Sequence, residues 1–238
     1  MQFPLFSFFT GLSLPCHCFI MNEKSSIHLR PGNDPADGSS GKNVTDIRSM
    51  EMSRIAVILE NRNKYTATGL IAEAFIRMAE KQGHTIRVFD TGSLHFDGCR
   101  GCETCFRNGK PCSFNDDFNV VAPSLEKADI IVYIMPVFFY SIPADIKAFM
   151  DKFFSYYITG RSYTGKKCAI IATSDDDGLK WSDPVRFMFL KSLSTLQVEN
   201  GGEIYLSGIR NRAGGITPDD LPSLIRGMTR SSELAKSF

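Results

Sequence analysis

The sequence carries no excess of charge of either sign. Its 238 residues include 27 Lys and Arg against 26 Asp and Glu, which gives a net charge of +1. This balance excludes a polybasic chain that would bind nucleic acid through counterion release, and it excludes a strongly acidic chain. Hydrophobic residues make up 43% of the chain and charged residues 22%, so most of it can bury a core.

Several catalytic and nucleotide-binding motifs are missing as well. There is no G-x-G-x-x-G and no Walker A sequence, which argues against the common dinucleotide-binding fold and against a nucleotide hydrolase. No two of the 4 histidines have the spacing of metal ligands, and neither a Ser-His-Asp arrangement nor a pair of catalytic carboxylates stands out. We therefore name no catalytic side chain, and we expect no nucleic acid as a partner.

The first fifty residues differ in composition from the rest. The segment Gln2–Met21 contains no Asp, Glu, Lys or Arg, yet no basic residue precedes this apolar run and no small-x-small cleavage site follows it. Residues 31–46 are almost entirely polar and cannot offset the entropy lost on ordering. We interpret residues 1–52 as a disordered or non-native leader and residues 53–238 as one domain of a cytoplasmic protein that binds no membrane. An export or anchor signal is the alternative.

From Arg54 onward, apolar runs typical of buried strands alternate with amphipathic patterns typical of helices. The expected strands are 55–59, 85–90, 129–135, 167–173 and 203–207, and the expected helices are 66–83, 116–127, 143–157, 183–196 and 217–236. This alternation predicts an α/β fold with a doubly wound parallel sheet and right-handed crossovers. The helix that begins at 143 should bury one face, made of Ile146, Phe149, Met150, Phe153 and Tyr157.

Sheets of this kind bind ligands at the carboxyl ends of their strands, which directs attention to three loops. The loop after the first strand contains Arg62 and leads through Thr66 and Thr68 into a helix. A helix N-terminus attracts phosphate, the two threonine hydroxyls could donate to it, and Arg62 could add charge. A polar turn with a threonine cap is the alternative.

The loop after the third strand holds three successive aromatic residues. They would expose costly apolar area unless something planar covers them, as a flat aromatic cofactor would. Packing against a neighbouring subunit is the alternative. In the loop after the fourth strand, Asp175–Asp177 indicates a solvated segment, and Trp181 either shields a cofactor or packs on the following helix. The residues of the aromatic loop are Pro136, Val137, Phe138, Phe139, Tyr140 and Ser141.

Four of the 7 cysteines lie close together, at Cys99, Cys102, Cys105 and Cys112. Such a cluster indicates a site and is not typical of a disulfide scaffold. The C-x2-C-x2-C-x6-C spacing lets the thiolates converge on one centre, and four thiolates are the ligand set of a [4Fe–4S] cluster. Structural or redox-active thiols without metal are one alternative, and zinc is another.

Two segments carry a resemblance to a known family. Pro136–Ser141 followed by Ile146–Lys152 resembles the flavin-edge loop and helix of the flavodoxin-like NAD(P)H-dependent FMN reductases, where the segment typically runs Pro-Val-Tyr-Phe-Gly-Ser and on to Leu-Lys-Ala-Leu-Ile-Asp-Arg. Gly98–Cys105 with Cys112 is similar to the compact four-cysteine motif of the iron–sulfur flavoproteins in that family. The first loop departs from the family, because 59–62 reads Leu-Glu-Asn-Arg where Gly-Ser-Pro-Arg is usual, and a glutamate there is unfavourable beside a phosphate unless it points away.

The resemblance implies a flavodoxin-like, three-layer αβα fold with a five-stranded sheet of order 2-1-3-4-5. It implies FMN held at its phosphate by Arg62, Thr66 and Thr68 and at its ring by 136–141, whose backbone N–H groups would meet the ring edge. NAD(P)H would be the electron donor, and a quinone, a flavin or another small molecule the acceptor. A homodimer or homotetramer is implied.

Two alternatives to a simple reductase stay open. In the first, the four cysteines hold a [4Fe–4S] cluster and the protein is an iron–sulfur flavoprotein that passes electrons to a redox partner protein. In the second, the altered first loop belongs to a binding or regulatory module that keeps the fold without flavin.

Overall fold

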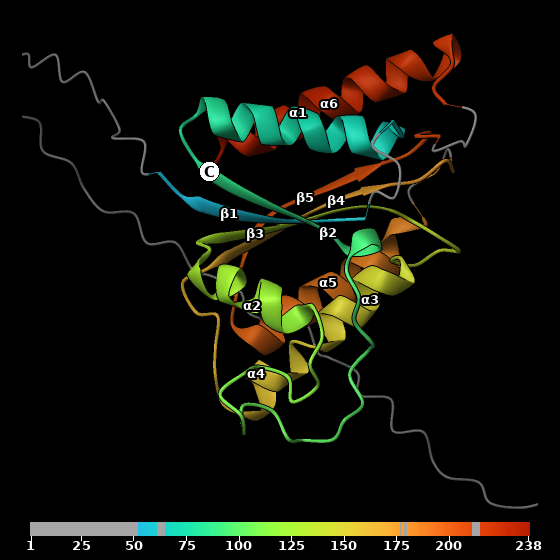
Figure 1. The fold of residues 1–238 in the computed structure, drawn as a ribbon. Helices are drawn as coiled ribbons and strands as arrows, with labels where there is room; N and C mark the ends of the chain where they lie inside the picture. The colour runs from blue at the N-terminus through green and yellow to red at the C-terminus, as the bar shows by residue number, and fades with distance from the viewer. Residues whose placement is uncertain (1–51, 61–64, 177, 179, 211–214) are drawn as a thin grey trace, which may run out of the picture. The chain divides into compact units, whose positions relative to one another are not determined.

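The computed structural model describes residues 52–60, 65–176, 178, 180–210 and 215–238. Its centre is a sheet of five parallel strands in the order β2-β1-β3-β4-β5 (Figure 1). The strands are β1 (Arg54–Leu59), β2 (Thr85–Asp90), β3 (Ile130–Pro136), β4 (Lys167–Thr173) and β5 (Glu199–Leu206). This is the flavodoxin-like arrangement expected from the sequence, and it confirms the predicted order. The predicted boundary at residue 53 stays a prediction, since residues 1–51 lie outside the described part of the chain.

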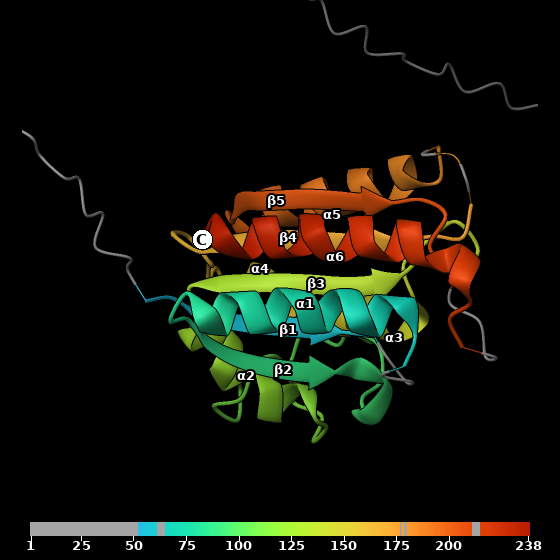
Figure 2. The ribbon, with the colours of Figure 1, turned by 90° about the horizontal axis from the view of Figure 1, so that it is seen from above.

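Helices cover both faces of the sheet, which makes three layers. On one face α1 (Ala67–Lys81) and α6 (Leu221–Lys236) lie side by side (Figures 1 and 2). The other face carries α2 (Phe118–Lys127), α3 (Ala144–Asp151), α4 (Phe154–Ile158) and α5 (Ser182–Leu196) (Figure 1). Two single-turn 3₁₀ helices, η1 (Thr91–Ser93) and η2 (Pro218–Asp220), follow β2 and precede α6.

Burial in the sheet follows the sequence patterns. All residues of β3 are buried, as expected of a continuous apolar run between two helical layers, whereas the edge strand β2 is half-exposed. One core lies between the sheet and α1 with α6, and the other between the sheet and the remaining helices. The described residues include no helix that is both long and apolar enough to cross a membrane.

The prediction of one continuous helix over 143–157 is wrong in one respect, because this segment is divided between α3 and α4. Lys152 and Phe153 separate the two helices, and their N–H groups donate to carbonyls three residues back, which tightens the turn. The tighter turn changes which side chains face the core. Tyr156 is 3% exposed and Tyr157 is 57% exposed, so Tyr156 takes the buried place predicted for Tyr157.

Two other boundaries differ from the expectation. Strand β5 begins at Glu199, four residues before the predicted start, because the polar stretch before residue 203 pairs along β4. Helix α6 begins at Leu221, after η2, where Thr217 and Asp220 form a capping box.

Candidate functional site

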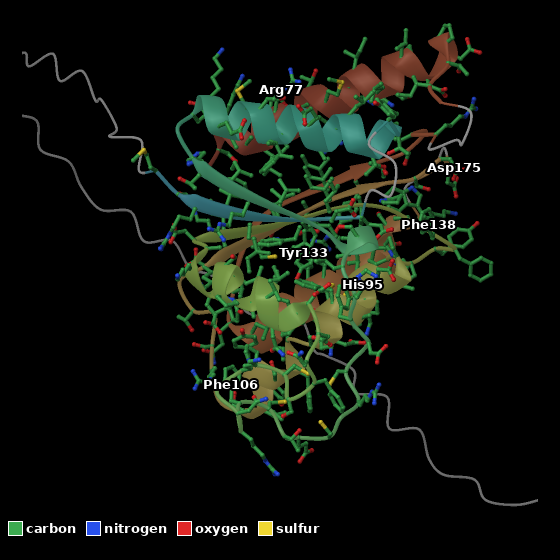
Figure 3. All side chains as sticks on the ribbon, in the orientation of Figure 1. Arg77, His95, Phe106, Tyr133, Phe138 and Asp175 are labelled. Carbon is green, nitrogen blue, oxygen red and sulfur yellow. The ribbon has the colours of Figure 1, made fainter. Side chains whose placement is uncertain are left out.

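The loops after β1, β3 and β4 are fixed to one another at the carboxyl ends of the strands. The N–H of Glu60 donates to the carbonyl of Ile134 at 3.1 Å, and the N–H of Val137 donates to the carbonyl of Thr173 at 2.7 Å. Phe138 and Asp175, which follow β3 and β4, lie at the same end of the sheet (Figure 3). The predicted flavin-site residues that the structure describes are therefore brought together at this edge.

The threonines at the start of α1 differ in their surroundings. Thr66 is the N-cap of α1, it is half-exposed, and its hydroxyl accepts the N–H of Gly69 at 3.1 Å. Thr68 is 1% exposed, and its Oγ1 lies 2.7 Å from Oγ1 of Thr173 at the end of β4. Thr66 thus borders the surface where a phosphate could approach, while Thr68 connects the helix to the sheet. Arg62 lies outside the described residues.

The glutamate that departs from the family sequence is held on the β2 side of the loop. Glu60 is 5% exposed, and its carboxylate accepts a hydrogen bond of 2.5 Å from the Thr91 hydroxyl in η1. The carboxylate is therefore engaged with η1.

The aromatic loop after β3 is a tight hairpin. Phe138 and Ser141 exchange two backbone hydrogen bonds of 3.0 Å, and the two residues between them have positive φ, 49° at Phe139 and 60° at Tyr140. A two-residue turn of this kind normally uses Gly, Asn or Asp, because large side chains are strained at positive φ. The backbone of 139–140 is therefore strained, and such strain persists where the surrounding structure imposes it, commonly at binding sites.

This hairpin presents its aromatic side chains to solvent. Phe138, Phe139 and Tyr140 are 55%, 100% and 65% exposed. Pro136 is buried at the end of β3, and Val137 is half-buried. Within the described chain, the N–H groups of Phe139 and Tyr140 make no hydrogen bond, whereas those of 137, 138 and 141 are all engaged. The hairpin tip thus combines open aromatic area with two backbone donors.

Trp181 is packed in the interior against Tyr205 and does not cover an open site. It is 2% exposed, its indole N–H donates to the Ser207 hydroxyl at 3.1 Å, and its ring meets that of Tyr205 edge to face at 6.1 Å. Asp175 and Asp176 are exposed, in agreement with the expected solvated loop, and Asp177 lies outside the described residues.

The four cysteines of 99–112 line one small pocket, together with Lys152, Phe154 and Ser155. Phe106 fixes this loop to α4, since its ring packs edge to face on Tyr156 at 5.4 Å and lies 4.2 Å from the Arg161 guanidinium. Figure 3 shows sulfur atoms in the loop that carries Phe106, at the α4 side of the molecule and away from Phe138. The cysteine pocket and the aromatic hairpin are therefore separate within one chain.

The thiols of this pocket have unlike environments. Cys99 and Cys102 are exposed, and Cys105 and Cys112 are half-buried. A hydrogen bond with the Thr104 hydroxyl lowers the pKa of Cys102, whereas burial, with help from the neighbouring thiols, raises the pKa of Cys105. Among the described residues, no three or more His, Cys, Asp or Glu side chains are arranged to hold a single metal ion.

Two residues at this pocket were not among the candidates from the sequence. Lys152 is buried, and its Nζ donates to Asp116 Oδ2 at 2.5 Å and to Cys112 Sγ at 3.5 Å. Burial alone would lower the pKa of Lys152, but the hydrogen bond to Asp116 and the charges of Asp116 and Cys112 raise it. Asn119 holds the Cys112 backbone, with one bond of 2.9 Å to its N–H and another of 2.9 Å to its carbonyl. The sequence signal that was available for Lys152 is its position next to Phe153, which belongs to the apolar face predicted for 143–157.

Comparisons with known proteins show the family of the chain and the fold that it shares. The family model described as NADPH-dependent FMN reductase matches residues 53–202. An iron–sulfur flavoprotein of Archaeoglobus fulgidus is 26% identical over 99 residues, which are 42% of this chain and 44% of that protein, so less than half of the relative is matched.

Two solved structures share the fold. An NAD(P)H:quinone oxidoreductase from Methanothermobacter marburgensis has a TM-score of 0.63 at 17% identity, covering 78% of this chain and 96% of its own. An FMN-dependent NADH-azoreductase from Bacillus anthracis, in complex with FMN, has a TM-score of 0.58 at 14% identity, covering 77% and 98%.

Proposed function

Because the chain belongs to the NADPH-dependent FMN reductase family, we propose that it binds FMN at the carboxyl ends of β1, β3 and β4 and passes electrons from NAD(P)H to a small acceptor. The proposal places the chemistry on the flavin, which when bound would take a hydride from the nicotinamide and release two electrons to the acceptor. In this proposal the protein side chains bind the flavin and orient it.

The observation that carries the proposal is the strained aromatic hairpin. Its tip exposes Phe139 completely and leaves the N–H groups of Phe139 and Tyr140 as donors, within the described chain. A flat ring with hydrogen-bond acceptors along one edge would cover the aromatic area and satisfy both donors. The ring system of FMN has this shape and chemistry.

The start of α1 supports a phosphate at the other end of the same ligand. Thr66 borders the surface at the helix N-terminus, where backbone N–H groups and the helix dipole favour an anion. The Glu60 carboxylate is engaged by Thr91, which lessens the objection that a glutamate precedes this loop. Arg62, which lies outside the described residues, stays a predicted phosphate contact, whereas the buried Thr68 hydroxyl, 2.7 Å from that of Thr173, holds the start of α1 in place.

For the acceptor we propose a planar small molecule such as a quinone or a flavin. The names of the structural neighbours, a quinone oxidoreductase and an azoreductase, support this class without choosing within it. The open hairpin supports it too, because a second flat molecule can approach a ring that lies on an exposed surface.

A second candidate function rests on the cysteine pocket. We propose that Cys99, Cys102, Cys105 and Cys112 hold a [4Fe–4S] cluster, which would exchange single electrons with a flavin or with a redox partner protein. Four thiols on one pocket supply the right donor set. Among the described residues, no three or more ligand side chains are placed to hold a single ion, so the support for a cluster from this chain is the set of four thiols itself. The similarity to an iron–sulfur flavoprotein supports this candidate.

We also propose that the protein forms a homodimer or a homotetramer. The exposed hairpin, together with Tyr157 and Phe187 at 57% and 67% exposure, offers apolar area that a second copy could cover. Light scattering on the purified protein tests this, and a monomer at micromolar concentration would refute it.

The experiment that tests the main function is purification without oxygen, followed by a visible spectrum, an iron assay and FMN titration. Bound FMN should raise the melting temperature, with a stabilisation of about 2.7 kcal/mol when free FMN is 100 times its Kd. A flavin spectrum without iron supports the reductase, and broad extra absorbance with iron supports the cluster. A colourless protein whose melting temperature does not respond to saturating FMN would leave the flavin-free module as the interpretation.

A further inference from the structure

A buried lysine faces the cysteine pocket. The Lys152 side chain is 3% exposed, and the nearby residues Phe149 and Phe153 belong to the hydrophobic core. An ammonium group in such a place is costly unless it is paired and hydrogen-bonded.

The ammonium has two partners from the loop that precedes α2. Its Nζ lies 2.5 Å from Oδ2 of Asp116 and 3.5 Å from Sγ of Cys112. The Asp116 carboxylate is itself 13% exposed, so the pair is shielded from solvent. One positive charge is therefore shared between a carboxylate and the sulfur of a candidate cluster ligand.

The position of Cys112 in front of this lysine is fixed independently. The Asn119 side chain accepts the N–H of Cys112 and donates to its carbonyl, both at 2.9 Å, and it donates to the carbonyl of Phe114 at 2.7 Å. Three hydrogen bonds from the first turn of α2 thus hold the backbone on either side of the cysteine. The contact between the sulfur and the ammonium follows from this arrangement and from the turn between α3 and α4.

We propose that Lys152 is a positioning residue that donates a hydrogen bond to Cys112 and favours the reduced state of the iron–sulfur cluster. This inference rests on the second candidate function, the cluster on the four cysteines. The step concerned would be the transfer of one electron from a reduced flavin to a cluster held by these cysteines; no bond would form or break, and no proton would need to move. The reduced cluster carries one more negative charge, so a fixed positive charge and an N–H donor at one ligand sulfur stabilise it more than the oxidised cluster.

The test compares the wild-type protein with Lys152→Met, Lys152→Gln and Lys152→Arg. All four proteins are full-length chains purified without oxygen. Lys147→Met is the matched control, because Lys147 is an exposed lysine on α3 whose partner is Asp151. Iron content and visible absorbance are measured first. The cluster is then titrated with a chemical reductant at defined potentials, and its reduced fraction is read by electron paramagnetic resonance.

At the wild-type midpoint, Lys152→Met should lower the ratio of reduced to oxidised cluster at least tenfold, which is 59 mV for a one-electron couple. Lys152→Arg should restore the ratio to within about threefold of wild type, since it keeps a charge and donors. Lys147→Met should leave the ratio unchanged. If the methionine variant does not retain iron, Lys152→Gln, which keeps an N–H donor without the charge, is the variant to read, and its midpoint must also move to lower potential.

An iron-loaded Lys152→Met or Lys152→Gln variant with the wild-type midpoint would overturn the inference while leaving the cluster in place. Wild-type protein without iron or cluster absorbance would overturn the cluster itself, and with it this role of Lys152. The two failures are thus distinguished by the iron assay made before the titration.

Discussion

Thr68 Oγ1 and Thr173 Oγ1 lie 2.7 Å apart in the interior, and they join the first turn of α1 to the carboxyl end of β4. Both residues are at most 1% exposed. The contact fixes two of the three loops of the candidate flavin site relative to each other, although Thr68 and Thr173 are 105 residues apart in the chain.

Thr68→Val should lower the free energy of unfolding of the flavin-free protein by about 1–2 kcal/mol. The change removes one partner of a buried hydrogen bond, so the Thr173 hydroxyl loses its bond with Thr68. Chemical denaturation measures this. The double variant Thr68→Val with Thr173→Val is the control, since replacing both partners costs less than the sum of the two single changes. Strictly additive costs would show that the two hydroxyls are not coupled.

Tyr140→Gly should stabilise the flavin-free protein by about 1 kcal/mol, because glycine adopts positive φ without the steric cost that a tyrosine pays at 60°. The family sequence Pro-Val-Tyr-Phe-Gly-Ser has glycine at this place. The matched control is Tyr157→Gly, another exposed tyrosine, which lies in α4 and should cost about 1 kcal/mol through lost helix propensity. Equal destabilisation by both changes would contradict strain in the hairpin.

The sheet and its ligand-binding edge could be predicted because they follow from local patterns. The apolar runs at 55–59 and 129–135 indicate strands buried on both faces, and the rule for right-handed crossovers then limits the topology. Thr66 as a cap is a local signal of the same kind, confirmed by its hydrogen bond from Gly69.

The features that could not be predicted depend on contacts between distant residues. The sequence does not indicate that Lys152 meets Cys112, 40 residues away, nor that Trp181 finds Ser207, 26 residues away. The exchange of Tyr156 for Tyr157 on the buried face follows from one tightened turn, which periodicity over a whole helix does not reveal.

Stability should depend on pH through Asp129, at the opposite end of the sheet from the hairpin. Hydrogen bonds from the Arg54 guanidinium hold the pKa of Asp129 down at about 2, against the opposing effect of burial. A carboxyl whose pKa is lowered on folding contributes stability above its unfolded value of 3.8, and this contribution is lost as the pH falls toward 2. Because both side chains are well exposed, the gain is less than about 1 kcal/mol.

Thermal melts between pH 6 and pH 2 measure this contribution. Asp129→Asn should lower the melting temperature at pH 6, and the difference from wild type should shrink below pH 4 and be small by pH 2. Arg54→Met should show the same pH dependence, because it removes the other partner. A difference that stays constant across this range would mean that the ion pair does not set the pKa of Asp129.

Phe139→Ser should weaken FMN binding with little change in the stability of the flavin-free protein. The Phe139 side chain is 100% exposed, so its removal leaves no cavity, and surface changes of this kind usually stay within about 0.5 kcal/mol. An aromatic contact with the flavin ring contributes about 1 kcal/mol, so Kd should rise about fivefold. Quenching of flavin fluorescence during titration gives the Kd. Phe187→Ser is the control, because Phe187 is an exposed phenylalanine on α5, and its loss should leave Kd unchanged. If the two variants bind FMN equally well, the hairpin is not the wall of the flavin site, and its exposed aromatics instead serve contact between subunits.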